Sequence, residues 1–267
     1  MTLAVCATPI GNLDDVTLRV LAELREADLV LAEDTRHTRG LLQRHGIEAK
    51  LLSYHEHNEA SRVAELLPRI VAGERVALVS DAGLPGVSDP GARLVRAALD
   101  AGAVVTVLPG ASAVETALVA SGLVSERYAF VGFLPRRAVE LAALWEELAG
   151  WRWPVVAFES PQRLGASLRS LAVLTPERDV VVCRELTKRF EEIVRGTASS
   201  LADRYAEPPK GEVTLVLGPA EPAPPGEDAA AAAVAELVAA GTPRKAAVEV
   251  VSRLTDMSRN DLYRGSL

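Results

Sequence analysis

The first 110 residues alternate between short apolar segments and longer amphipathic segments. The apolar segments are rich in Val and Leu and rarely alternate with polar residues, a pattern typical of strands buried on both faces. Strand-like and helix-like segments in this order favour a parallel sheet covered by helices. We therefore predict an α/β fold with strands at 3–8, 28–33, 50–54, 75–80 and 103–110.

The second half of the chain has a different pattern. Strand-like segments at 179–186, 191–197 and 212–218 have only one helix-like segment among them, at 199–207. Closely spaced strands favour hairpins and hence a mixed sheet. We therefore predict a first α/β domain over 1–112 and a second over 113–218.

A Pro-rich segment follows, with four Pro between residues 218 and 228. Such composition is typical of an extended linker, which we predict over 219–228. Residues 229–267 then predict a small helical C-terminal extension. Two interpretations of this extension stay open: a helix-turn-helix-like module that binds RNA, or helices that only pack against the core or a second copy.

Composition limits the class of protein. A chain of 267 residues that is 49% hydrophobic can bury a sizeable core, and its net charge of −7 argues against a uniformly basic surface but not against a local basic patch. Cys6 and Cys183 lie in apolar runs, which favours buried free thiols over a disulfide or a zinc site. No cationic leader and no run of about 18–20 apolar residues is found, so we expect a cytoplasmic protein without a membrane anchor.

Glycine-bearing turns follow three of the predicted strands, at 7–12, 80–91 and 108–113. In open α/β sheets, ligands bind outside the carboxyl ends of the strands. Glycine lets the backbone approach a ligand, and amides at helix starts bind polar groups. Any one of these turns could be a mere tight connection, but together they predict a ligand pocket lined mostly by backbone. Its candidate residues are Gly11, Asp81, Gly83, Gly110 and Ser112.

Standard nucleotide and metal signatures are missing. The sequence has no G-x-x-x-x-G-K-[ST] motif and no G-x-G-x-x-G after the first strand, although Glu33 stands where a dinucleotide fold would carry its ribose-binding acid. His55 and His57 have no third metal-ligating partner nearby in the sequence. We therefore expect no metal ion and no standard dinucleotide site.

A set of ordered motifs covers about residues 3–217 and carries a family resemblance. They include "ATPIGNLDDVTLR", "AEDTRHTRGLL", "SDAGLPGVSDPG", "LPGASAVETALVASGL", "FVGFLPR", "FESPQRL" and "CRELTKRFEEIVRG". This set resembles the small-subunit ribosomal RNA methyltransferases of the tetrapyrrole methylase superfamily. The resemblance implies two α/β domains of the class III methyltransferase type with S-adenosylmethionine in a cleft between them. It also implies methylation of a cytidine ribose 2′-oxygen in the decoding region of small-subunit rRNA, and a homodimer.

The resemblance also implies where the cofactor binds. Relatives commonly carry G-D-P where this chain has Gly83-Leu84-Pro85, so Leu84 is expected to contribute only backbone or apolar contact. With the pocket residues already given, the expected cofactor-binding set is Ile10, Gly11, Asp81, Gly83, Leu84, Pro85, Val87, Gly110, Ser112, Ala113, Phe158 and Leu186.

Methyl transfer from a sulfonium to a ribose hydroxyl needs alignment of the reacting groups and help in removing a proton. The candidate catalytic residues are Asp81, Glu159 and Arg184. Alternatives remain open, since Asp81 could instead cap the amides of its own turn and Arg184 could form a structural ion pair with Glu185.

RNA binding requires a local cluster of cations despite the acidic total charge. The candidate RNA-binding residues are Arg36, Arg39, Arg44, Arg136, Arg137 and Lys188, although a solvated helix face is the alternative for the first three. Aromatic residues make up only 4% of the chain, so we expect little stacking of single-stranded bases. Recognition of shape, as in an assembled ribosomal subunit, fits this composition better.

Two rival functions remain. A methyltransferase acting on a corrin precursor would use the same cofactor and fold, but the Arg-bearing helix at 35–46 and the C-terminal extension argue against it. A non-catalytic RNA-binding assembly factor would not need the intact Gly-rich turns. Binding of S-adenosylmethionine separates the second rival from an enzyme.

Overall fold

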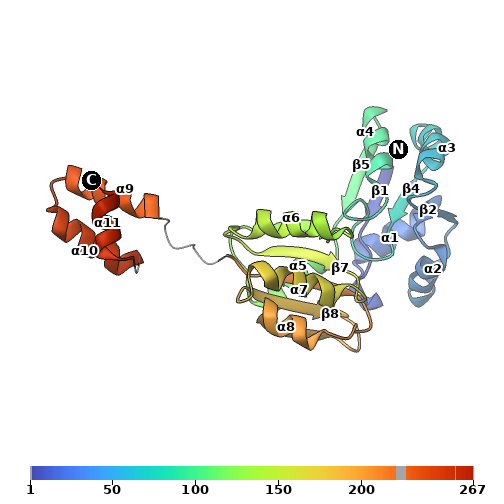
Figure 1. Cartoon of the computed structure of the whole chain (residues 1–267). Helices are drawn as coiled ribbons and strands as arrows, with labels where there is room; N and C mark the ends of the chain where they lie inside the picture. Colours follow the sequence, from blue (N-terminus) through green and yellow to red (C-terminus); the bar gives the residue numbers. More distant parts are fainter. Residues whose placement is uncertain (1, 221–226, 256, 267) are drawn as a thin grey trace. The chain divides into compact units, whose positions relative to one another are not determined.

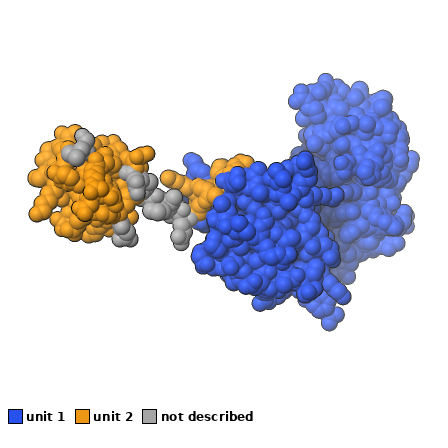
Figure 2. Space-filling model, viewed as in Figure 1, with its two compact units in different colours: residues 1–146, 153–219 blue, residues 147–152, 220–267 orange. Residues whose placement is uncertain are grey.

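The computed structural model describes residues 2–220, 227–255 and 257–266. The chain divides into two compact units, one made of residues 1–146 and 153–219 and the other of residues 147–152 and 220–267 (Figure 2). Both predicted α/β domains therefore lie in the larger unit, except for residues 147–152. Most of the predicted linker, residues 221–226, lies outside the described residues.

The first half of the larger unit is built on a five-stranded sheet in the order β3-β2-β4-β1-β5, and every neighbouring pair is parallel (Figure 1). The strands are β1 (Thr2–Cys6), β2 (Leu29–Ala32), β3 (Leu51–Ser53), β4 (Val76–Val79) and β5 (Val104–Leu108). They are connected by η1 (Leu13–Asp15), α1 (Leu18–Glu26), α2 (Thr35–Arg44), α3 (Glu59–Val71) and α4 (Ala92–Asp100). The predicted parallel sheet is confirmed.

Alternate residues of each strand reach opposite faces of this sheet, and both faces are covered. On one face, Ala4 and Cys6 of β1 belong to a buried cluster with side chains of α1 and α2. On the other, Leu3 of β1 belongs to a cluster with Leu66 of α3 and Leu94 of α4. Burial on both faces explains why the strands are almost purely apolar.

The second half of the larger unit contains a mixed five-stranded sheet in the order β6-β7-β10-β8-β9. Only β6 and β7 are parallel, while the other neighbouring pairs are antiparallel. This confirms the predicted mixed sheet. Its strands are β6 (Ala129–Phe133), β7 (Val155–Glu159), β8 (Asp179–Arg184), β9 (Glu192–Thr197) and β10 (Val213–Leu217), and the helices of this half are α5 (Ala113–Ser121), α6 (Ala138–Leu148), α7 (Leu164–Leu174) and α8 (Ala198–Arg204).

The smaller unit contains α9 (Glu227–Ala239), α10 (Arg244–Thr255) and α11 (Arg259–Gly265). These helices share a buried cluster that includes Val234 of α9, Val248 of α10 and Leu262 of α11. The extension therefore has a small core of its own. Among the described residues, no helix is long and apolar enough to cross a membrane.

Candidate functional site

The three Gly-bearing turns lie at one edge of the first sheet, because β4, β1 and β5 are neighbours in it. The turns are also hydrogen-bonded to one another. The Thr8 N–H donates to the Gly83 carbonyl (2.8 Å), and the Gly83 N–H donates to the Thr8 carbonyl (3.1 Å). The Ala7 N–H donates to the carbonyl of Leu108 (3.1 Å). The three turns are therefore neighbours in the structure, and the ligand pocket that they would line stays a prediction.

Glycine has a different function at two points of this edge. Gly83 has φ +77°, a backbone conformation that favours glycine, and a Cβ built on it would be in ordinary contact with the Ala111 carbonyl oxygen and Cγ2 of Ile10, both 3.9 Å away. A Cβ on Gly110 would lie 2.9 Å from the Cβ of Ala7, so a side chain there would push two turns apart. Gly83 therefore permits a positive φ, whereas Gly110 permits close packing.

An apolar cluster brings together the expected cofactor residues of both halves. Ile10 and Leu186 are 6% and 7% exposed and belong to one buried cluster. Ala113 and Phe158 pack against this cluster, and Ala82 and Ala111 of the other two turns do so as well. The structure thus brings residues from all three turns, from β7 and from the loop after β8 to one place.

The remaining expected cofactor residues lie on the same turns. Leu84 is half-buried, Pro85 is buried, and Val87 is 45% exposed. Ser112 precedes α5, and its hydroxyl donates to the Glu115 carboxylate rather than capping the helix. The first amides of α5 are therefore not capped by this side chain.

Gly11 packs against the second half of the unit. A Cβ on it would lie 2.5 Å from Cγ of Lys188 and 2.8 Å from the carbonyl oxygen of Leu186. The adjacent Asn12 N–H donates to the Thr187 hydroxyl (3.0 Å). The absence of a side chain at Gly11 thus lets the loop after β8 approach the turn after β1.

The loop after β8 is held by ion pairs that the sequence did not suggest. Glu185 pairs with Lys188 (2.8 Å), and Arg184 pairs with Glu192 (3.0 Å). The suggested Arg184–Glu185 pair is therefore wrong. The pKa of the Glu185 carboxyl is lowered, mainly by the hydrogen bond from Lys188. Arg184 and Lys188 both contact carboxylates of their own chain.

Asp81 does not cap its own turn, contrary to the alternative raised from the sequence. Its Oδ1 accepts a hydrogen bond from the Asp34 N–H (3.0 Å), after β2. Two other carboxyls lie near it electrostatically. Burial, and then the charge of Asp81, raises the pKa of Glu33. Burial, and then the charge of Glu33, raises the pKa of Asp89 to about 7. Three carboxyl groups therefore lie near one another beside the turn that bears Gly83.

Glu159 is enclosed at the end of β7. Its side chain is 0% exposed, with the Arg163 guanidinium 3.3 Å away. The Ser160 N–H donates to its Oε1 (2.7 Å), and the Ser167 hydroxyl donates to its Oε2. A carboxylate held in this way cannot reach a substrate hydroxyl. The structure therefore argues against Glu159 as a proton acceptor.

The predicted RNA-binding cations differ in their partners. Arg36 pairs with Asp34 (2.6 Å) and thereby lowers the pKa of that carboxyl. Arg44 pairs with Asp14 (2.9 Å). Pairs of such exposed side chains contribute little to stability and can exchange for phosphate.

Three more of the six predicted cations are also exposed, whereas the sixth, Lys188, is half-buried. Arg137 pairs with Glu140 (2.8 Å). Arg39 and Arg136 have no carboxylate partner among the described residues. These two are the cations most available to phosphate.

Two side chains near the site were missed by sequence reasoning. Arg163 contacts Glu159 and donates to the carbonyls of Leu134 and Pro135. Phe133 is 62% exposed, and its ring centroid is 5.4 Å from that of Phe158. The only available signal for Phe133 was Gly132 inside an otherwise apolar strand, which suggests a bulge.

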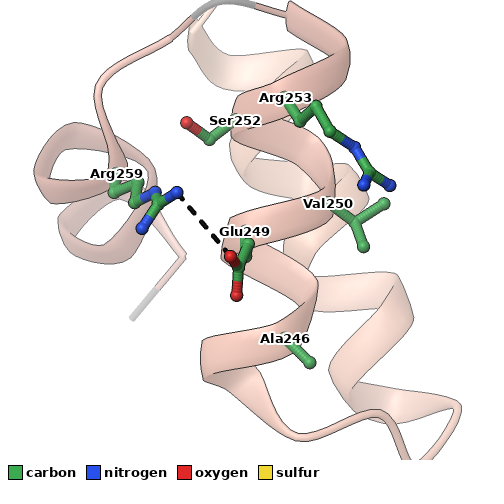
Figure 3. A pocket seen from close by; sticks show the side chains of 6 residues that line it. All are labelled: Ala246, Glu249, Val250, Ser252, Arg253 and Arg259. Carbon is green, nitrogen blue, oxygen red and sulfur yellow. Dashed lines mark ion pairs between the residues drawn. The ribbon is translucent and has the colours of Figure 1, made fainter.

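The smaller unit has a groove of about 490 Å³. It is lined by Ala246, Glu249, Val250, Ser252, Arg253 and Arg259 (Figure 3). Glu249 and Arg259 face one another across it, 3.7 Å apart. This pair offsets part of the positive charge there. None of the turns that converge in the larger unit contributes to this groove.

No group of three or more His, Cys, Asp or Glu side chains within the described part of the chain could hold a metal ion. Cys6 and Cys183 are both buried and free. Burial raises the pKa of the Cys183 thiol to about 11, so this sulfur is protonated at neutral pH.

The comparison with known proteins gives one consistent result. The family model of the Tetrapyrrole (Corrin/Porphyrin) Methylases matches residues 2–202. A Mesorhizobium japonicum protein named "Ribosomal RNA small subunit methyltransferase I" is 44% identical, over 98% of this chain and 90% of its own length. A Streptococcus pyogenes protein of the same name is 40% identical, over 98% and 93%.

Solved structures with a similar fold include a uroporphyrin-III C-methyltransferase from Thermus thermophilus complexed with S-adenyl homocysteine. The TM-score is 0.56 at 20% identity, over 81% of this chain and 96% of that chain. At this identity the likeness establishes the fold alone.

Proposed function

Since this chain belongs to the tetrapyrrole methylase family, we propose that it transfers a methyl group from S-adenosylmethionine to RNA of the small ribosomal subunit. The acceptor in this proposal is the ribose 2′-oxygen of a cytidine in the decoding region. The observation that carries the proposal is 44% identity over 98% of the chain to a protein named for this substrate. Such a substrate implies action in the cytoplasm, where ribosomes are.

The residues at the converged turns fit the cofactor. Gly83 adds no side chain where the turns meet, and the apolar cluster around Ile10 and Leu186 offers a surface to a nucleoside. The carboxyls of Glu33, Asp81 and Asp89 suit a group that bears a sulfonium and an ammonium. The proposed binding residues are Ile10, Gly83, Leu84, Pro85, Val87, Gly110, Ser112, Ala113, Phe158 and Leu186.

The chain's own part in the reaction is positioning and proton removal. When bound, the cofactor supplies an electrophilic methyl group. Of the three catalytic candidates, Glu159 is enclosed and Arg184 pairs with Glu192, which leaves Asp81, a half-buried carboxylate on the turn that bears Gly83. We assign to Asp81 the proton of the attacking hydroxyl. The Asp34 N–H fixes the orientation of this carboxylate.

Exposed cations support contact with an RNA backbone. Arg39 on α2 and Arg136 before α6 have no carboxylate partner among the residues described, and Arg36, Arg44 and Arg137 can exchange their exposed partners for phosphate. An assembled small subunit presents a fixed RNA surface to such scattered cations, and it is the proposed substrate.

A homodimer is also part of the proposal. The edge strand β5 exposes Val104 and Val107, at 57% and 51%, and an exposed apolar edge suits a second copy. Light scattering at micromolar concentration tests this part. A monomer mass would refute it without affecting the assigned reaction.

The reaction is tested on small subunits isolated from cells that lack the corresponding methylase. The protein and tritiated S-adenosylmethionine are added, and rRNA fragments are analysed by mass spectrometry. We expect one ribose-methylated cytidine, and a fall of about 10²- to 10⁴-fold in rate for Asp81→Asn, as for loss of a general base. Methylation of an added tetrapyrrole but not of RNA would refute the substrate. No binding of S-adenosylmethionine by calorimetry would refute the enzyme.

A further inference from the structure

The last residue of β6 is turned outward by an irregularity in the strand. The register of β6 against β7 shifts between Phe130 and Phe133, and Gly132 has φ +69°. A bulge of this kind re-aims the side chain that follows it and is often found beside active sites. As a result Phe133 is 62% exposed, whereas its neighbour Leu134 is only 1% exposed.

The exposed ring is backed by the apolar cluster of the cofactor site. The rings of Phe133 and Phe158 meet edge to face with centroids 5.4 Å apart, and Phe130 meets Phe158 in the same way at 5.0 Å. Phe158 in turn packs against the cluster that contains Ile10 and Leu186. Phe133 is thus the outer member of an aromatic row that starts at the expected cofactor residues.

Hydrogen bonds hold the backbone segment that carries Phe133. The Leu134 N–H donates to the Phe158 carbonyl (3.0 Å), and the Arg163 guanidinium donates to the carbonyls of Leu134 (3.2 Å) and Pro135. Arg163 is itself held by the enclosed carboxylate of Glu159 (3.3 Å). This network gives a function to Glu159 and Arg163 that does not require contact with substrate. It presents an exposed aromatic ring on a rigid support.

The turn that bears Gly83 is close by. A Cβ built on Gly132 would lie 3.6 Å from the hydroxyl of Ser88, which belongs to the same turn. Arg136 and Arg137 follow Phe133 by three and four residues, and Arg136 has no carboxylate partner in the described part of the chain. Cations that follow an exposed aromatic ring so closely in the chain suit a nucleotide, whose base stacks while its phosphate is neutralised.

We propose that Phe133 stacks on an unpaired base of the substrate RNA and that Arg136 binds a neighbouring phosphate. This inference rests on the proposed function and adds the residue that positions the acceptor nucleotide. It also departs from the expectation of little base stacking, because one exposed ring beside the cofactor site is enough. Proteins that read single-stranded RNA commonly stack bases on such rings.

The test uses the full-length protein and unmethylated small subunits. Phe133→Leu keeps an apolar side chain but removes the π face, whereas Phe133→Tyr keeps it. We expect kcat/KM for methyl transfer to fall about 5- to 150-fold in Phe133→Leu, the range of one stacked base, and to stay near the parent value in Phe133→Tyr. Affinity for S-adenosylmethionine, measured by calorimetry, should not change in either variant.

Val139→Ala is the matched control, because Val139 is an exposed apolar side chain of α6 (77%) outside the site. It should have parent activity. Arg136→Gln should weaken subunit binding and lower its salt dependence by about one ion.

Parent activity in Phe133→Leu would overturn the stacking, as would an equal loss in Phe133→Tyr. Conversion of Phe133→Leu to a monomer would reassign the ring to a dimer contact. Failure of the parent protein itself to methylate the subunit would refute the proposed function, and the stacking proposal with it.

Discussion

Replacement of Glu159 by Gln tests whether this carboxylate supports the structure or takes part in the reaction. The side chain is 0% exposed and accepts hydrogen bonds from the Ser160 N–H and the Ser167 hydroxyl, with Arg163 3.3 Å away. A Gln at this position has one oxygen and one NH₂ group. Its NH₂ would face a donor on one side, and Arg163 would lose its counter-charge.

The magnitude follows from these contacts. One buried donor left without an acceptor costs about 1–3 kcal/mol of the free energy of unfolding, which is our expectation for Glu159→Gln. Glu159→Ala removes the whole carboxylate and should cost about 3–5 kcal/mol, as when one member of a buried ion pair is lost. Ser167→Ala is the matched control. It removes a neutral donor only and should cost about 1 kcal/mol.

The assay combines urea unfolding with methyl transfer at a temperature at which both proteins are folded. We expect the lower stability just given, together with a rise in KM, because Arg163 no longer fixes the segment that carries Phe133. A general base would show the opposite behaviour, with unchanged stability and a loss of about 10²- to 10⁴-fold in kcat. That second result would refute our assignment of Glu159 to support.

Three further predictions concern the turns of the site. Gly110→Ala should weaken S-adenosylmethionine binding about tenfold, because overpacking against Ala7 costs about 1–3 kcal/mol. Gly40→Ala in α2 is the control, since a Cβ there meets nothing within 4 Å, and it should bind as the parent protein does. Equal affinities of Gly110→Ala and the parent protein by calorimetry would contradict the prediction. Thr187→Val should lower cofactor affinity about 2- to 10-fold and speed hydrogen exchange of the Asn12 amide, because it removes the hydroxyl that accepts from this amide. Thr187→Ser should restore both, and unchanged exchange in Thr187→Val would refute a function for this hydrogen bond. Burial raises the pKa of the folded-state Asp89 carboxyl to about 7, so its contribution to the free energy of unfolding should be lost as pH rises from about 4 to about 7. Urea unfolding should show a shallower fall with pH in Asp89→Asn than in the parent protein. Parallel pH profiles of the two proteins would contradict this.

The sheets could be predicted because their signal is local. In β1 and β4 every described side chain is buried, so the strands are apolar without alternation, and the intervening helices force the strands to be parallel. The convergence of the three turns then follows from strand order. The mixed second sheet could be recognised because β8, β9 and β10 follow one another with a single short helix among them.

The partners of polar side chains could not be predicted, since each depends on residues that are distant in the sequence. Asp81 accepts from the Asp34 N–H, 47 residues away. Arg184 pairs with Glu192 across a hairpin rather than with its neighbour Glu185. Both carboxylates and guanidiniums are plausible catalytic groups by type. Only the fold decides which of them still faces a substrate.

What requires glycine at each position could not be predicted from the sequence either. A glycine in the sequence indicates that a side chain is excluded, but it does not say what excludes it. At Gly83 it is the backbone conformation, with φ +77°, rather than a close neighbour. At Gly11 the space is filled by Leu186 and Lys188 of the other half, and at Gly110 by a neighbouring turn. A glycine that permits packing acts on the cofactor only through the position of the turns it holds together. Substitution there should therefore change stability and affinity together.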